Sequence, residues 1–194
     1  VIQKTKTTKL MKQVKVVPGT TDAFGTRPTD RTISLGRADV FRLQAVFESG
    51  ASDTDAVAPT ITLSDVNGTF TRGEKITGAT SGATARIITT STPIQLVYTS
   101  GPSRTFAVNE TITAESSLAT GTVGSVTPGD DVITGNYQLD TGQRDNYYDI
   151  ARIVRRPGLP PPTGRLLIVF DYLEHSAGDV ITVDSYVDVA NQMD

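Results

Sequence analysis

The sequence predicts an all-β protein built from several small β-sandwich or barrel-like modules, joined by loops and preceded by an extended N-terminal arm. The 194 residues include 17 Gly and 10 Pro, which is typical of chains with many turns. Short segments alternate between apolar and polar residues, and one 18-residue pattern occurs twice. We therefore divide the chain into residues 1–59 (basic arm, strands and linker), 60–130 (a two-copy hairpin repeat) and 131–194 (a β-sandwich-like module).

Charge is unevenly distributed along the chain. Residues 1–38 carry eight Lys/Arg and two Asp, a net charge of +6, whereas residues 39–194 carry a net charge of −9. The arm lysines are Lys4, Lys6, Lys9, Lys12 and Lys15. Clustered lysines can neutralise nucleic-acid phosphates, but no aromatic residue lies among them to stack on bases. We interpret the arm as a solvated strand or as a segment that docks on an acidic neighbour, and we do not expect nucleic acid as a partner.

Alternating residues predict the first strands. Val14 and Val16 alternate with polar residues until Pro18-Gly19 ends the pattern. Residues 31–35 and 38–48 are typical of two strands around a turn at Gly36. In the second of these we expect a single apolar face formed by Phe41, Leu43, Ala45 and Phe47. A short helix over residues 37–47 is the alternative, and residues 49–59, small and polar, are typical of a linker or long loop.

The internal repeat aligns residues 70–87 with residues 106–123 at an offset of 36, without gaps. Seven of the eighteen positions are identical: Phe70/Phe106, Glu74/Glu110, Ile76/Ile112, Thr77/Thr113, Ser81/Ser117, Ala83/Ala119 and Thr84/Thr120. Gly73 corresponds to Asn109, and both residue types tolerate positive φ in tight turns. Each copy therefore predicts a turn, a strand, a small-residue turn and a second strand.

Two hairpins that cannot bury an apolar face alone are expected to pair into one small β-domain. The alternative is a ligand surface, for example for a glycan, at Ser81-Gly82 and the Thr-rich edges. The chain has no Trp to stack on a sugar. Residues 78–85 lack the Gly-x-x-x-x-Gly-Lys-Ser/Thr pattern, which excludes a phosphate loop of that type.

The C-terminal third predicts a second module. Residues 140–142, Asp-Thr-Gly, favour a hairpin turn, and residues 147–156 favour a strand with Tyr148, Ile150 and Val154 on one face. Residues 157–164, which contain three consecutive prolines, are expected to be a stiff connector. The run Leu166–Phe170 is apolar on both faces, as in a strand inside a sandwich, and residues 180–189 alternate like a half-buried strand.

The inventory of reactive residues points to no enzyme, no cofactor and no metal. Without Cys and with a single His, His175, the chain offers no thiolate or multi-histidine zinc site, and we expect His175 to be a surface or structural residue. Its longest apolar run has five residues, against the ~20 that cross a bilayer, so no membrane insertion is expected. Nothing selects a catalytic pair from the carboxylates, which include Asp130, Asp131, Asp140, Asp145, Asp149, Asp171 and Glu174. The group Asp140, Asp145, Asn146 and Asp149 supplies oxygen ligands but lacks the EF-hand spacing.

The C-terminal segment resembles a known family. Its characteristic strings are Tyr137-Gln-Leu-Asp-Thr-Gly-Gln-Arg-Asp-Asn-Tyr-Tyr-Asp149, Arg155-Arg-Pro-Gly158, Pro160-Pro-Pro-Thr-Gly164, Val169-Phe-Asp-Tyr172, Glu174-His-Ser176 and Val183-Asp-Ser-Tyr186. They cover about a third of the chain and resemble a domain of virion structural proteins of tailed bacteriophages, especially the long tail, baseplate and fibre-linked proteins of cyanophages. The Gly-Glu-x-Ile-Thr-Gly string of the repeat is similar to inserts in such proteins.

The resemblance implies a non-enzymatic structural component of a phage tail assembly, at the baseplate or fibre attachment, located in the virion and assembled in the host cytoplasm. Its implied partners are other virion proteins and further copies of itself in a symmetric assembly. A receptor- or glycan-binding adhesin domain of a tail fibre is the alternative. Because the sequence begins at Val1, we also expect it to be an excerpt of a longer polypeptide or its ordered part.

Overall fold

The computed structural model describes residues 5–14, 27–101, 103–144 and 149–174. This part of the chain is all-β, which confirms the predicted fold class, and none of its helices is long and apolar enough to span a membrane. Its strands are β1 (Thr5–Val14), β2 (Thr32–Ser34), β3 (Val40–Glu48), β4 (Thr60–Asn67), β5 (Lys75–Gly78), β6 (Thr84–Ile87), β7 (Ile94–Tyr98), β8 (Thr111–Ala114), β9 (Thr120–Thr127), β10 (Asp131–Val132), β11 (Tyr137–Asp140), β12 (Arg152–Arg155) and β13 (Leu166–Glu174). A 3-10 turn, η1 (Thr134–Asn136), precedes β11.

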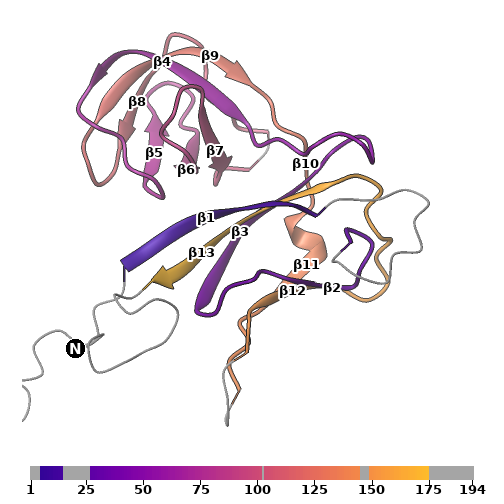
Figure 1. The fold of residues 1–194 in the computed structure, drawn as a ribbon. Helices are drawn as coiled ribbons and strands as arrows, with labels where there is room; N and C mark the ends of the chain where they lie inside the picture. The colour runs from indigo at the N-terminus through magenta and orange to yellow at the C-terminus, as the bar shows by residue number, and fades with distance from the viewer. Residues whose placement is uncertain (1–4, 15–26, 102, 145–148, 175–194) are drawn as a thin grey trace, which may run out of the picture.

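The strands form a closed barrel and two sheets (Figure 1). The barrel has the order β4-β7-β6-β5-β8-β9, the larger sheet β1-β13-β3-β10 and the smaller sheet β11-β12-β2. In the view of Figure 1 the barrel lies above the larger sheet and the smaller sheet lies below it. Strands from before and after the barrel pair with one another, since β13 lies between β1 and β3 and β12 lies between β11 and β2.

The internal repeat builds the barrel, as predicted, and gives it an internal two-fold symmetry. The hairpins β5–β6 and β8–β9 have the same register, because Lys75 pairs with Arg86 and the equivalent Thr111 pairs with Thr122. The two copies meet where Thr77 pairs with Thr113, its own equivalent at the offset of 36. The preceding strands are exchanged: β4 pairs with β9 of the second copy, and β7 pairs with β6 of the first.

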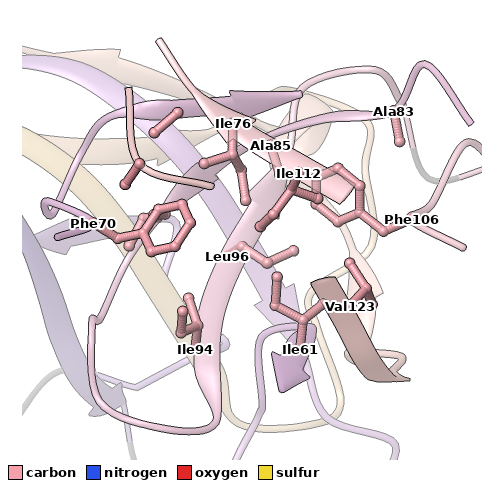
Figure 2. Close-up of a cluster of buried hydrophobic side chains, with 13 residues drawn as sticks. Ile61, Phe70, Ile76, Ala83, Ala85, Ile94, Leu96, Phe106, Ile112 and Val123 are labelled. Carbon is pink, nitrogen blue, oxygen red and sulfur yellow. The ribbon is translucent and has the colours of Figure 1, made fainter. Parts of the chain in front are cut away.

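The barrel is filled by apolar side chains from both copies (Figure 2). Its largest members are Ile61, Phe70, Ile76, Ile87, Ile94, Leu96, Phe106, Ile112 and Val123. The two repeat phenylalanines, Phe70 and Phe106, are 8% and 4% exposed. Burial of this apolar surface is the main force that closes the barrel, because it removes each hairpin's inner face from water.

Strand β13 is buried on both faces, which confirms the prediction for Leu166–Phe170. On one face, Leu166, Ile168 and Phe170 belong to the inter-sheet core, which lies between the two sheets and also includes Ile33, Leu35, Val40, Val46, Tyr137, Ala151, Ile153 and Tyr172. On the other face, Leu167 and Val169 belong to the junction cluster, which joins the larger sheet to the barrel and also includes Ala45, Phe47, Ala56, Ala58, Ile88 and Val97.

The single apolar face expected in β3 is wrong, and so is the alternative helix over residues 37–47. Ala45 and Phe47 pack in the junction cluster, whereas Leu43 packs against the inter-sheet core and Phe41 is 40% exposed. Register shifts opposite β13 insert an extra residue at two points of β3. Each extra residue moves the side chains that follow it to the opposite face.

The predicted face of residues 147–156 is also wrong. Ile150 is 49% exposed, whereas Ile153 is completely buried. Ile153 occupies the middle strand of the smaller sheet, where it pairs with both Leu139 and Ile33. Apolar residues occur at both odd- and even-numbered positions of this segment, so alternation alone does not show which face is buried. Some predictions fall outside the described residues: the start of this strand (residues 147–148), the strand at 180–189 and the stop at 18–19. Residues 145, 146 and 175 also lie outside them.

The turns of the two hairpins use the same backbone conformations. Gly73 and Asn109 both have positive φ, at 84° and 67°, as the sequence predicts. Gly82 (φ 62°) corresponds to Leu118 (φ 57°), whose side chain is 74% exposed. A residue with a Cβ atom is strained in this conformation, so the second copy carries a cost that the first avoids.

We expect Leu118→Gly to raise the free energy of unfolding by about 1 kcal/mol, because it relieves the left-handed strain at an exposed position. The matched change Gly82→Leu should lower it by a similar amount. Urea unfolding followed by circular dichroism measures both. The interpretation is contradicted if Gly82→Leu is more stable than the wild type or if Leu118→Gly is less stable.

Candidate functional site

Two buried glutamates hold the repeat copies together by exchanged hydrogen bonds. Glu110 of the second copy accepts bonds from Thr80 N (3.0 Å), Ser81 N (2.9 Å) and Ser81 Oγ (2.8 Å) of the first copy. Glu74 of the first copy accepts bonds from Ser117 N and Ser117 Oγ of the second, both at 3.1 Å. We call these two arrangements the Glu–Ser clamps.

Each clamp also holds the turn on its own copy. Glu110 accepts a bond from Ala107 N, and Glu74 accepts one from the equivalent Thr71 N. The two glutamates are 4% and 6% exposed, so each carboxylate replaces its lost water with backbone and hydroxyl donors. Burial alone would raise the pKa of Glu110, but the hydrogen bonds from Ser81, Ala107 and Thr80 outweigh it and lower the pKa below its ordinary value of 4.5.

Ser81 has a structural role in a clamp. The sequence also suggests a ligand surface at Ser81-Gly82 as an alternative. The Ser81 hydroxyl donates to Glu110 and also accepts a bond from Ala83 N (3.1 Å). A Cβ added at Gly78 would lie 2.7 Å from both a Glu110 carboxylate oxygen and Ser81 Oγ. The small residues of this turn therefore make room for the carboxylate. The identity of Glu and Ser in both copies was the sequence signal for the clamps, but it did not show that the contacts are exchanged.

We expect Glu110→Gln to destabilise the protein by about 2 kcal/mol at neutral pH, because an amide cannot accept all four donors. Folding lowers the pKa of Glu110. Its contribution to the free energy of unfolding is therefore fully present above the pKa that Glu110 has in the unfolded chain, and it is lost as the pH falls through the lower pKa of the folded state. The stability difference between wild type and Glu110→Gln should therefore shrink in acid.

Urea unfolding across the acid range measures this difference, and Glu115→Gln is the matched control, because Glu115 is an exposed glutamate on the same hairpin, directly after β8. Equal effects of the two changes at neutral pH would rule out the clamp as a major source of stability.

The hairpin that joins β11 to β12 carries an ion-pair cluster. Asp140 contacts Arg144, with Nη2 2.8 Å from Oδ2, and Arg152, with Nε 3.2 Å from Oδ2. Asp149 contacts the same Arg152 (Nη2 to Oδ2, 2.8 Å). The Arg144 hydrogen bond, followed by the Gly142 N–H at 3.0 Å, lowers the pKa of Asp140 to about 2. The turn predicted at residues 140–142 is misplaced, because Asp140 is the last residue of β11 and still pairs with Arg152, so the chain reverses after Gly142.

The carboxylates considered from sequence are dispersed by the fold. Asp140 and Asp149 come together, but around Arg152, so arginine occupies the space between these two members of the proposed calcium group. Asp130 accepts a bond from Val57 N (2.7 Å), and Asp171 is completely buried and accepts one from Gln44 Nε2. Among the described residues, no three His, Cys, Asp or Glu gather as a metal site. Asp145, Asn146 and His175 lie outside the described residues.

We expect Arg144→Gln to raise the pKa of Asp140 from about 2 towards 3.8, because it removes the largest cause of the shift. The stabilising contribution of ionised Asp140 is present above its unfolded pKa and is lost as the pH falls towards 2. Carboxyl NMR titration measures the midpoint. Arg156→Gln, a change at an exposed arginine beyond the hairpin, should leave the midpoint unchanged, and an equal shift in both variants would refute the assignment.

A groove with a cavity of about 170 Å³ lies where the barrel meets the larger sheet. Its apolar lining includes Phe47 from β3, Val97 from β7 and Val132 from β10, while Gln44 and Asp130 supply polar groups. The lining comes from segments about 85 residues apart in the sequence, and no local pattern predicts it.

Comparison of the whole chain with protein-family models, curated protein sequences and solved structures found no match.

Proposed function

We propose that this chain is a structural component of a bacteriophage tail assembly, at the baseplate or fibre attachment, and that it acts through protein–protein contacts. The proposal joins the family resemblance of residues 137–186 to one structural observation, the position of β1. This ten-residue strand is an edge of the larger sheet and pairs with β13 on one side. Among the described strands, none pairs with its other side.

A sheet edge of this length that no described strand covers can accept a strand from a neighbouring protein. The sequence of β1 contains Lys6, Lys9 and Lys12, and edge lysines oppose indiscriminate pairing between like strands. They also favour an acidic partner. Residues 39–194 carry a net charge of −9, so the acidic body of the next copy complements the basic strand, as repeated contacts in a symmetric assembly require.

The layers behind this edge support a scaffold role. The junction cluster and the inter-sheet core lie on the two faces of β13, the strand that pairs with β1. The strand that holds β1 is therefore itself packed against both the barrel and the smaller sheet. Strands β11 and β12, with the ion pairs beside them, lie on the side of the inter-sheet core away from the larger sheet (Figure 1).

We expect antibodies against the purified chain to label the tail end of intact virions of the phage that encodes it, at the baseplate or fibre attachment. The variant Lys6→Glu/Lys9→Glu/Lys12→Glu should be incorporated into fewer particles, because it reverses the charge of the edge strand. Electron microscopy with immunogold labelling measures both, and Arg104→Glu is the control at an exposed barrel loop.

Virions that contain none of the chain would refute the proposal. Binding of the isolated chain to host cells or to a glycan array, together with labelling only at fibre tips, would instead favour the adhesin alternative.

A further inference from the structure

A polar pocket of about 250 Å³ lies at one end of the barrel, where the turn before β5 meets the turn after β8. Arg72, Lys75 and Arg86 line it, together with Glu74 and Glu115. The three basic residues come from the turn, from β5 and from β6. Arg72 is exposed, and Lys75 and Arg86 are half-buried, so their charges border the pocket and remain accessible to water.

The two arginines are held in place by hydrogen bonds to backbone carbonyls and not by ion pairs. Arg72 Nε donates to Ile88 O at 2.7 Å, and Arg86 Nη1 donates to Gly73 O at 2.9 Å. Each guanidinium thus donates one N–H to a backbone carbonyl, and its remaining N–H groups can donate to a ligand. Among the described residues, none of Arg72, Lys75 and Arg86 forms an ion pair.

Lys75 and Arg86 are also directly opposite each other across β5 and β6. Like charges at directly opposed positions destabilise an antiparallel pair. A stable barrel does not need this pair, because the equivalent position in the second copy is occupied by Thr111 and Thr122 in the same register. The first copy therefore carries an electrostatic cost that its duplicate lacks.

The internal repeat supplies a comparison for the whole pocket. At the offset of 36, Arg72 corresponds to Val108, Lys75 to Thr111 and Arg86 to Thr122. All three positive charges are absent from the second copy, although its clamp is complete and Glu110 is buried beside neutral residues. A buried clamp glutamate thus does not require neighbouring cations, and the cluster in the first copy needs another explanation.

The two acidic residues at the pocket lower the formal charge of its lining from +3 to +1 but do not pair with its cations. The carboxylate of Glu74 is occupied by donors from Thr71 and Ser117. Glu115 is exposed, and its backbone N–H donates to Lys75 O at 2.9 Å. Neither carboxylate forms an ion pair with any described residue.

We propose that this pocket binds a small oxyanion, such as phosphate or sulfate, between Arg72, Lys75 and Arg86. The free guanidinium N–H groups suit the oxygens of a tetrahedral anion, and the ammonium of Lys75 adds a point charge. The anion relieves the repulsion between Lys75 and Arg86, so its binding stabilises the folded barrel. The same chemistry accommodates free phosphate, free sulfate or a sulfate or phosphate group on a larger ligand.

Thermal unfolding of the 194-residue chain at constant ionic strength tests the proposal. Replacing chloride by saturating phosphate or sulfate should raise the Tm of the wild type by about 5 °C. Isothermal titration with each anion, and with a sulfated and a phosphorylated monosaccharide, distinguishes free anions from larger ligands.

The decisive variant gives the first copy the residues of the second: Arg72→Val/Lys75→Thr/Arg86→Thr. It should lose the anion-dependent rise in Tm and bind at least about tenfold more weakly. Lys75→Thr alone, which removes no hydrogen bond made to a described residue, should raise the Tm in chloride and weaken anion binding. It decides the question if the triple variant does not fold.

Arg104→Thr removes one positive charge from an exposed loop of the same barrel and should leave anion binding unchanged. The proposal is overturned if phosphate and sulfate do not raise the wild-type Tm above its value in chloride. It is also overturned if Lys75→Thr and Arg104→Thr weaken binding equally.

Discussion

The structure depends on a single strand whose two faces must both be kept from water. Leu166, Ile168 and Phe170 alternate with Leu167 and Val169 along β13, and each of these side chains is at most 9% exposed. One covering layer can bury only one set, so two layers are required. The barrel covers one face through the junction cluster, and the smaller sheet covers the other through the inter-sheet core. This requirement explains why residues before and after the barrel return to pair beside β13.

The barrel solves a different problem, the instability of an isolated hairpin. The two copies of the repeat exchange strands and side-chain contacts. Each copy therefore needs the other to complete its strand pairing. The Glu–Ser clamps reinforce this exchange, because each buried carboxylate finds its hydroxyl donor only on the opposite copy. Closure also removes sheet edges from the barrel. Among the described strands, β1 and β10 are the edges of the larger sheet.

Patterns within a short stretch predicted the fold class, the paired hairpins, the positive φ of Gly73 and Asn109, and the two-sided burial of Leu166–Phe170. The failures arose where local alternation is not sufficient. Bulges in β3 change which residues face the core, and a one-residue insertion leaves no mark in the apolar pattern. Pairing of β1 with β13 joins residues more than 150 positions apart. The basic pocket was equally hidden, since Arg86 becomes a neighbour of Lys75 only through the register of the β5–β6 hairpin.

The duplication also explains where this chain is able to vary. Positions that fill the barrel or form the clamps are constrained in both copies, because their side chains pack in the shared core or bond to the other copy. Lys75 and Arg86 occupy alternate positions that point away from the barrel core, next to the fully buried Ile76 and Ala85. A change at such a position alters the surface without disturbing closure. One copy can therefore acquire charge while the other preserves the neutral arrangement, and the cost of the Lys75–Arg86 pair is confined to the outer face, where a bound anion can offset it.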